Sequence, residues 1–209
     1  NPVGPFVKAG TAERLLPGDV LAGGHRSRHD SMKTTTTKST TTLKTHRLQL
    51  RPMQADDFDA LHEIFSDPRV MASFDSEPLT PAQMQRWLQR NLDHQSQFGY
   101  GLFSVVETAS GRLVGDCGLE RMEIEGQTVA ELGYDFRSDV WDQGFATEAA
   151  AAVRDYAFEV LCLPRLVSLM RVGNVASQRV AEKVGMRREA EFERYEARYF
   201  RYGIEAPAA

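Results

Sequence analysis

The short segment Trp141–Ala149 lies where a predicted strand meets a predicted helix. The segment before it is rich in β-forming residues, and the apolar residues after it recur at helical spacing. The turn at Gly144-Phe145-Ala146 leaves the first amide groups of that helix without intrahelical partners, and the helix dipole adds positive charge there. Such a helix start binds anions, so the sequence predicts a phosphate-bearing ligand at this turn.

Two familiar phosphate-binding patterns are absent from this run. It contains neither the G-x-x-x-x-G-K-[ST] of nucleotide triphosphatases nor the G-x-G-x-x-G of dinucleotide-binding folds. Instead, Trp141-x-x-Gly144-x-Ala146 followed by Thr-Glu-Ala resembles the pyrophosphate loop of GCN5-related N-acetyltransferases (the GNAT superfamily), which is written Q/R-x-x-G-x-G/A. The leading tryptophan and the closing A-T-E-A are similar to the RimJ/RimL-like branch, the ribosomal-protein-alanine acetyltransferases.

The resemblance extends from about residue 45 to about residue 205. It includes the first strand and helix of that branch, its fourth strand, and a late helix with the turn after it. These segments are Thr45–Pro52 with Phe58–Phe65, Ala130–Tyr134, and Asn174–Ser177 with Glu182–Met186. The resemblance implies an α/β (α+β) fold in a single GNAT-like domain, with a mixed, mostly antiparallel seven-stranded sheet. In that fold the fourth and fifth strands splay apart, and about four helices flank the sheet.

Local patterns predict elements in this order. We expect strands at 46–53, 100–107, 112–122, 128–136, 165–171, 187–194 and 197–205. We expect helices at 56–66, 80–95, 144–161 and 176–184. Asp56 would cap the first helix, and Thr80 with Pro81 would begin the second. Short turns at Ser110-Gly111 and Glu125-Gly126 make the three central strands an antiparallel meander.

Residues 1–44 differ in composition from the rest of the chain. They are rich in Gly, Pro, Ser and Thr, and the tract at 34–42 is low in complexity. Such a segment has too little apolar surface to offset the entropy of ordering, so we expect a disordered leader before an acetyltransferase domain at 45–209. Met32 could be the natural start, with residues 1–31 derived from an expression vector or an upstream reading frame. The alternative is a natural leader.

Acetyl transfer from acetyl-CoA, the co-substrate that the resemblance implies, needs a neutral amine, a donor for the oxyanion and a proton for the leaving thiolate. Alkyl amines and α-amines are mostly or partly protonated at neutral pH, so a base is required. Glu131 is our candidate, because a carboxylate is out of pattern in the apolar strand Val129–Tyr134. The resemblance implies that a glutamate here acts through water. The alternative is an exposed glutamate on an alternating strand.

Asn174 and Ser177 are further candidates near the start of the last helix. Asn174 can cap that helix, and the resemblance implies that it contacts the pantetheine arm. Many superfamily members carry a tyrosine acid four residues after the serine position, where this chain has Ala181. In the RimL-like branch a serine at the position of Ser177 is a proposed acid. We expect Ser177 to hydrogen-bond the departing sulfur, and the alternative is a small packing residue.

The remaining candidate residues would bind the coenzyme. Backbone amides of the loop would hold the pyrophosphate, and the preceding strand would pair with the pantetheine amides. The loop residues are Gln143, Gly144, Phe145, Ala146 and Thr147, and the strand residues are Tyr134, Asp135 and Phe136. Asp142 stands where the branch usually has glycine, and we interpret Trp141 as a packing residue rather than a stacking one.

The resemblance implies that the acceptor is the N-terminal α-amine of a protein or peptide, which attacks acetyl-CoA directly in a ternary complex. The alternatives are a small amine, such as an aminoglycoside, a polyamine or an amino acid, and a non-catalytic coenzyme-A-binding module. Four aromatic residues fall where the family builds its acceptor pocket, although core packing explains them equally well. They are Phe74, Trp87, Phe98 and Tyr100.

Composition narrows the functional classes. The 209 residues are 42% hydrophobic and carry a formal net charge of −4, which suits one domain and gives no support for nucleic-acid binding. No apolar run reaches the roughly 20 residues that span a membrane, and no secretory segment is visible, so we expect a cytoplasmic monomer or homodimer. The histidines and the two cysteines, Cys117 and Cys162, show no metal-binding spacing. We therefore expect no metal and interpret both cysteines as packing residues.

Overall fold

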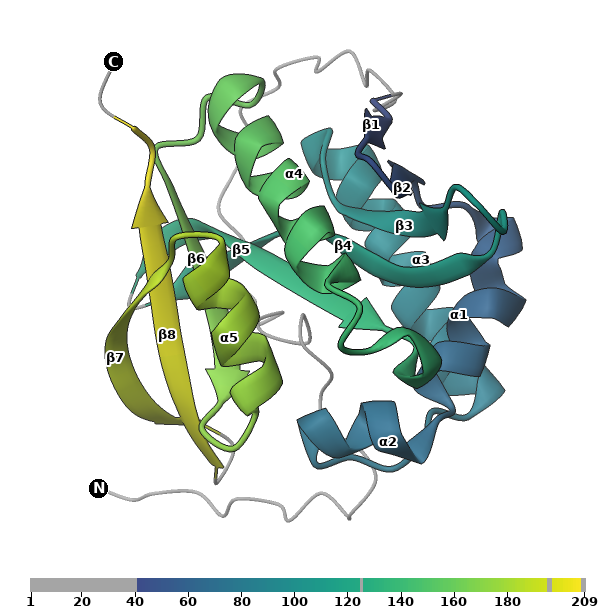
Figure 1. Ribbon diagram of the computed structural model, residues 1–209. Helices are drawn as coiled ribbons and strands as arrows, with labels where there is room; N and C mark the ends of the chain where they lie inside the picture. Colours follow the sequence, from purple (N-terminus) through teal and green to yellow (C-terminus); the bar gives the residue numbers. More distant parts are fainter. Residues whose placement is uncertain (1–40, 125, 195–196, 208–209) are drawn as a thin grey trace, which may run out of the picture.

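The computed structural model describes residues 41–124, 126–194 and 197–207 (Figure 1). One sheet runs through this part of the chain, in the strand order β1-β2-β3-β4-β5-β6-β8-β7. The strands are β1 Leu43–Lys44, β2 Leu48–Pro52, β3 Leu102–Glu107, β4 Leu113–Ile124, β5 Gln127–Phe136, β6 Arg165–Arg171, β7 Arg187–Arg194 and β8 Ala197–Glu205. Neighbouring strands are antiparallel except β5 and β6, which are parallel. The predicted mixed sheet is therefore confirmed, with eight strands in place of seven.

The helices follow the predicted order with one addition. They are α1 Phe58–Phe65, α2 Pro68–Met71, α3 Pro81–Phe98, α4 Phe145–Glu159 and α5 Val175–Lys183, with 3₁₀ turns η1 Ala55–Asp57, η2 Ala72–Phe74 and η3 Ser138–Val140. Strand β1 and helix α2 had no counterpart in the prediction. Each is too short for hydrophobic periodicity to reveal it. The signal for α2 is Asp67-Pro68, because the Asp67 carboxylate accepts the N–H of Arg69 at 2.9 Å and caps the turn.

The first strand also moves the start of the ordered domain. Leu43 pairs with Leu50 across β1 and β2 and packs against the main core, although it falls within the predicted leader. The remainder of that leader, up to residue 40, lies outside the described residues.

The predicted helix caps have different outcomes. Thr80 caps α3, since its hydroxyl accepts the N–H of Gln83 at 3.3 Å. This helix runs three residues beyond the prediction and ends at Gly99, which has a positive φ of 75°. The Asp56 cap is wrong, because Asp57 accepts the N–H of Gln54, at 2.8 Å, and so fixes the helix start.

Helices cover both faces of the sheet (Figure 1). In that view α4 and α5 lie in front of the sheet, while α3 lies behind it. The main core joins α4 to the sheet through residues such as Leu119, Leu132 and Val153, all fully buried. A second core forms where α1 and α3 pack together, around Leu61, Met84 and neighbouring side chains. Strand β4 is therefore packed on both faces, by α4 on one side and by α1 on the other.

The sheet opens between β5 and β6. These strands pair only at Ala130 with Leu166 and at Glu131 with Val167, and each continues for several residues without a pair on the other. The predicted splay of the fourth and fifth predicted strands is thus confirmed. The split places the C-terminal half of β5 and that of β6 on opposite sides of a gap in the backbone ladder.

Candidate active site

The start of α4 has the geometry of an anion-binding helix terminus. Gly144 precedes the helix with a φ of +82°, and no side chain caps the first turn. Glu148 donates its N–H to the carbonyl of Gly144 at 3.0 Å, so the amides of Phe145, Ala146 and Thr147 come before the hydrogen-bonded ladder. Three successive backbone donors and the positive end of a fifteen-residue helix thus meet at one point. This fits the pyrophosphate of a coenzyme.

Asp142 keeps the backbone conformation that a glycine would adopt. Its φ is +59°, in the left-handed region that aspartate tolerates better than most residues, and its side chain is exposed. The departure from the usual glycine therefore leaves the shape of the loop intact.

Arg47 holds the first turn of α4 from the edge of the sheet. Its guanidinium Nε donates to Glu148 Oε2 at 2.7 Å, and another nitrogen donates to the carbonyl of Gln143 at 2.8 Å. The hydroxyl of Thr45 donates to the other Glu148 oxygen at 2.6 Å. Burial alone would raise the pKa of Glu148, but these hydrogen bonds hold it below its usual value. A carboxylate in the anion-binding turn is thereby neutralised and directed away from the amides; sequence reasoning missed this role of Arg47.

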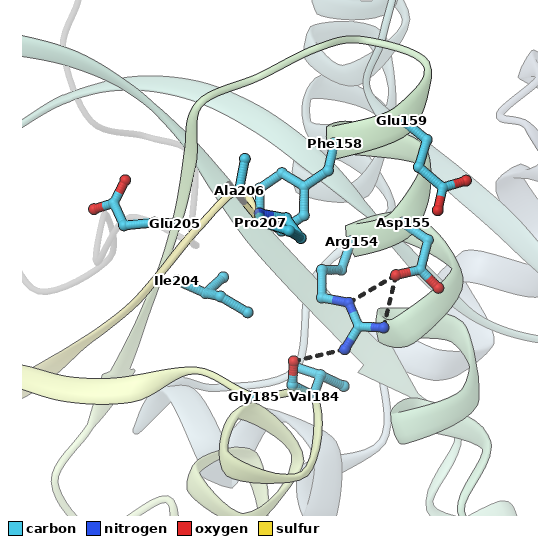
Figure 2. Close-up of a pocket in the computed structure, with 10 residues that line it drawn as sticks. All are labelled: Arg154, Asp155, Phe158, Glu159, Val184, Gly185, Ile204, Glu205, Ala206 and Pro207. Carbon is cyan, nitrogen blue, oxygen red and sulfur yellow. Dashed lines mark hydrogen bonds and ion pairs between the residues drawn. The ribbon is translucent and has the colours of Figure 1, made fainter. Parts of the chain in front are cut away.

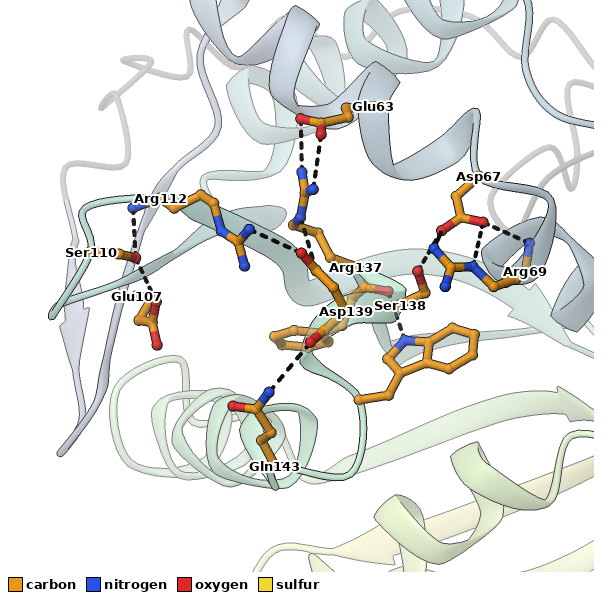
Figure 3. A network of polar contacts seen from close by, with 12 residues as sticks. Glu63, Asp67, Arg69, Glu107, Ser110, Arg112, Arg137, Ser138, Asp139 and Gln143 are labelled. Carbon is orange, nitrogen blue, oxygen red and sulfur yellow. Dashed lines mark hydrogen bonds and ion pairs between the residues drawn. The ribbon is translucent and has the colours of Figure 1, made fainter.

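A network of ion pairs anchors the segment between β5 and α4 (Figure 3). Arg137, just after β5, binds Glu63 of α1 at 2.8 Å and Asp139 at 3.2 Å. Ser138 donates to Asp67 at the start of α2. Gln143 reaches back to the carbonyl of Asp139 at 3.4 Å. The loop is therefore fixed to the helices behind the sheet, and its amides are held in place before any ligand arrives.

Trp141 is exposed and does not pack in the core. The residue is 46% exposed, and its indole N–H donates to the carbonyl of Phe136 at 2.9 Å. Any packing role of Trp141 is therefore outside the core, and the choice of packing over stacking stays a prediction. The contact also occupies the Phe136 carbonyl at the end of β5, so that group is already bonded within the protein.

Glu131 lies where β5 and β6 part. Its side chain is 4% exposed, and its Oε1 accepts the N–H of Leu169 on β6 at 3.2 Å. The carboxylate thus accepts a hydrogen bond that a backbone carbonyl of β5 would accept if the two strands stayed paired beyond Val167. Its Oε2 lies over Gly133, 3.4 Å from the position that a Cβ on that glycine would occupy. The alternative of an exposed glutamate is wrong.

The start of α5 lies on the other side of the split. Asn174 caps this helix as predicted, since its Oδ1 accepts the N–H of Ser177 at 3.1 Å. The hydroxyl of Tyr134 crosses from β5 and donates to the carbonyl of Ser177 at 2.8 Å. Burial raises the pKa of Tyr134 well above its usual value. Ala181, at the position of the usual tyrosine acid, is fully buried in the main core.

The structure assigns packing roles to several remaining candidates. Trp87 is 4% exposed and packs on Phe65 with ring centroids 4.8 Å apart, so core packing explains it. Phe98 and Tyr100 are half-buried around His94 at the end of α3. Phe74 lies nearer the split, because its carbonyl accepts from Arg171 at the end of β6 at 3.4 Å.

The two cysteines differ. Cys117 is fully buried, and burial raises the pKa of its thiol well above the ordinary value, as a packing residue requires. Cys162 is exposed, so the packing interpretation is wrong there.

Within the described ranges, no three histidine, cysteine or acidic side chains come together to hold a metal ion. The helices of the same ranges include none that is long and apolar enough to cross a membrane.

A groove of about 490 Å³ lies elsewhere on the molecule (Figure 2). It is formed by the last turns of α4, the turn after α5 and the end of β8. Arg154 crosses it, donating to the carbonyl of Val184 at 2.8 Å. Phe158 is fourteen residues from Gly144, so the groove is roughly 20 Å along the helix from the anion-binding turn. None of the predicted site residues lines it.

The face of the sheet behind α4 carries carboxylates that sequence reasoning did not single out. Asp116 and Glu120 on β4 lie directly opposite Asp135 and Glu131 on β5, and side chains paired in this way share a face. A carboxylate at a split in the sheet, an anion-binding helix start and a row of acidic side chains thus lie around one strand. This arrangement suits transfer of an acyl group from a phosphate-bearing carrier to an amine that arrives as a cation and loses a proton before it attacks.

The fold and site define an acyltransferase class, and comparison with known proteins identifies the family. A profile of the acetyltransferase (GNAT) domain matches residues 47–187, more than half of the chain. The chain therefore belongs to the GNAT family and is an N-acetyltransferase. It is 37% identical over 147 residues to the uncharacterized protein YkkB of Bacillus subtilis, covering 70% of this chain and 85% of YkkB. It is 31% identical over 156 residues to the uncharacterized N-acetyltransferase p20 of Bacillus licheniformis, covering 74% and 87%.

Solved structures share the fold but differ in acceptor. A GNAT-family acetyltransferase from Bacillus anthracis has a TM-score of 0.68 at 27% identity, covering 79% of this chain and 98% of the other. Two more share the fold alone. The ribosomal-protein-S5-alanine acetyltransferase of Vibrio fischeri has a TM-score of 0.66 at 17% identity, covering 80% and 97%. The spermidine N-acetyltransferase of Vibrio cholerae, solved with CoA and spermine, has a TM-score of 0.62 at 20% identity, covering 77% and 96%.

Proposed function

We propose that this enzyme transfers the acetyl group of acetyl-CoA directly to a primary amine, with Glu131 as the general base. The observation that carries the proposal is the position of the Glu131 carboxylate, buried at the split in the sheet with Oε1 on the N–H of Leu169 and Oε2 over Gly133. A base held in this way keeps one orientation while an amine approaches over Gly133. It takes a proton from the ammonium form, directly or through a water, and the neutral amine attacks the thioester.

The chain's own groups account for binding and for the leaving thiolate. GNAT acetyltransferases use acetyl-CoA, and the amides of Phe145, Ala146 and Thr147 suit its pyrophosphate. Asn174 and the unpaired part of β5 would align the pantetheine arm along the split. Ser177, held by Asn174 and Tyr134, would hydrogen-bond the departing sulfur.

Two acceptor classes remain for this reaction. The resemblance to the RimJ/RimL-like branch favours the N-terminal α-amine of a protein or peptide. The second candidate is a small amine with more than one positive charge, and the row of carboxylates on β4 and β5 favours it. The fold does not separate the two, because similar structures include enzymes described for each acceptor.

A thiol-release assay with acetyl-CoA over a panel of amines tests the proposal. The panel holds peptides with alanine or serine at the N-terminus, aminoglycosides, amino acids and polyamines. We expect acetyl-CoA to raise the melting temperature and at least one primary amine to release CoA above background. A clear melting shift with no turnover across the panel would support a non-catalytic CoA-binding module instead.

A further inference from the structure

The carboxylate row has a symmetric layout on the face of the sheet opposite α4. Asp116 pairs with Asp135, Gly118 with Gly133, and Glu120 with Glu131, in one continuous antiparallel register. Two pairs of carboxylates therefore flank a pair of glycines. Charges of like sign directly opposite each other are unfavourable in a sheet unless something compensates them.

The Glu120–Glu131 pair has compensation within the protein. Arg90 of α3 places a guanidinium nitrogen 4.0 Å from a Glu120 oxygen. Glu131 accepts the N–H of Leu169 at 3.2 Å. This end of the row thus retains partners for its negative charge.

The Asp116–Asp135 pair lacks such compensation. Asp116 is fully buried, and neither of its carboxylate oxygens has a hydrogen-bond partner among the described residues. The next strand places Ser104 opposite Asp116, but the Ser104 hydroxyl donates to Asp57 at 2.7 Å. Arg51 on β2 lies opposite Ser104 in turn, but its guanidinium is held by the same Asp57 through contacts of 2.8 and 2.5 Å. A buried carboxylate without a partner is costly, so this pair must hold a proton or receive a cation.

Asp135 is the accessible member of the pair. It is half-buried, whereas Asp116 behind it is sealed from solvent. Burial, and then the charge of Glu120, raise the pKa of Asp135 to about 7. Burial, and then the charges of Asp135 and Glu120, raise the pKa of Asp116 well above its usual value. Arg137, two residues after Asp135 and just beyond β5, is occupied by Glu63 and Asp139.

The space between the two carboxylate pairs is open at Gly133. A Cβ built on this glycine would have one neighbour within 4 Å, the Oε2 of Glu131 at 3.4 Å. An amine above Gly133 would therefore lie beside the candidate base. Asp135 is two residues further along the same face, which is about 7 Å in a strand.

We propose that Asp135, backed by Asp116, binds a second ammonium group of the acceptor, and that the acceptor is a diamine or longer polyamine. The reacting amine lies over Gly133 beside Glu131, and the second cation lies about 7 Å away at Asp135. This inference rests on the proposed acetyl transfer, but binding at the cation subsite can be measured separately as a release of protons. The bound cation replaces the proton that the Asp116–Asp135 pair otherwise holds.

Calorimetric titration tests the subsite without requiring turnover. Putrescine, a diamine, is compared with n-butylamine, which has the same carbon chain and one amine, in the absence and presence of CoA. We expect putrescine to bind at least about tenfold more tightly near neutral pH, and to release protons, measured as a dependence of the heat on buffer ionisation. Asp135→Asn should remove both the preference and the proton release, and Asp116→Asn should reduce both.

Glu123→Gln is the matched control. Glu123 is an exposed carboxylate of β4, and because it is an odd number of residues from Asp116 it lies on the other face of the sheet. It should keep the preference for the diamine. Equal binding of the two amines to the wild-type protein, or a preference undiminished in Asp135→Asn, would overturn the inference; so would a preference for an alanine-initiated peptide over putrescine.

The thiol-release assay with the same two amines separates this inference from the proposed function. Turnover of n-butylamine with no advantage for putrescine would leave acetyl transfer standing and remove the subsite. Preferred binding of putrescine without turnover of any amine would leave the subsite standing and contradict acetyl transfer.

Discussion

The start of α4 and the carboxylate row on β4 and β5 suit ligand groups of opposite charge, and they do so with different parts of the chain. At α4 the backbone amides of Phe145 to Thr147 would face the proposed ligand, and the side chains matter mainly by being small or turned aside. On the carboxylate row the side chains would face the proposed ligand, and the backbone only sets their register. The first site is therefore local in the sequence, whereas the second depends on how two strands align.

Gly144→Val should cause the largest loss of acetyl-CoA binding, because Gly144 belongs to the proposed site that is formed by backbone groups. Its φ of +82° is strained for a β-branched residue, and the added side chain would approach Arg47, whose nitrogen is 3.5 Å from the position of a Cβ. We expect the melting shift produced by acetyl-CoA to be abolished, as measured by thermal unfolding with and without the ligand.

Gly99→Val is the control, since Gly99 has a φ of +75° at the end of α3, on the other side of the sheet from α4 (Figure 1), and a Cβ there would have no neighbour within 4 Å. It should carry a similar backbone strain and keep the acetyl-CoA shift. A full shift retained in Gly144→Val would count heavily against the assignment of the loop.

Ser177→Ala should have an intermediate effect. The variant keeps the backbone contacts to Asn174 and Tyr134, so the helix start should be preserved while the hydroxyl is lost. We expect kcat to fall by about tenfold to a hundredfold, with little change in the KM for acetyl-CoA. The measurement is steady-state thiol release, with Ser110→Ala in the exposed β3–β4 turn as control. An unchanged kcat would reduce Ser177 to a packing residue.

Asp116→Asn should also have a smaller effect, on the pH dependence of stability. With pKa values raised in the folded protein, the Asp116–Asp135 pair binds more protons when native than when unfolded between about pH 4 and about pH 7. The free energy of unfolding should therefore fall as pH rises through this window, by roughly 1–3 kcal/mol in the wild-type protein. Asp116→Asn should flatten this dependence, measured by urea unfolding at several pH values. Equal slopes in variant and wild type would show that the pair does not store a proton.

These two sites also differ in how far the sequence predicts them. The small residues around Gly144, between a strand pattern and a helix pattern, predict the anion-binding turn without any tertiary information. The positions of Glu131 and Asn174 followed from pattern and resemblance, and the structure confirms the Asn174 cap. The contacts of Arg47 with Glu148 join residues a hundred positions apart, so no local pattern reveals them.

The carboxylate row has a signature in the sequence that the local patterns did not reveal. Asp116-x-Gly118-x-Glu120 and Glu131-x-Gly133-x-Asp135 are mirror images about the predicted turn at 125–126. A two-residue hairpin turn fixes the register of its strands, so pairing Ile124 with Gln127 carries through to Asp116 with Asp135. What the sequence does not contain is the burial of Asp116, which depends on the helices packed over that face.

The most direct test of the central claim is the pH profile of Glu131→Gln. The amide can still accept the N–H of Leu169, and the proposed coenzyme site consists mainly of backbone groups, so the acetyl-CoA melting shift should be preserved. Turnover near neutral pH should fall by about a hundredfold or more, as expected for loss of a general base. The loss should shrink as pH approaches the pKa of the acceptor, at lower pH for an α-amine near 8 than for an alkyl amine near 10.4. Turnover unchanged between about pH 6 and about pH 9 would contradict the assignment of Glu131 as the base.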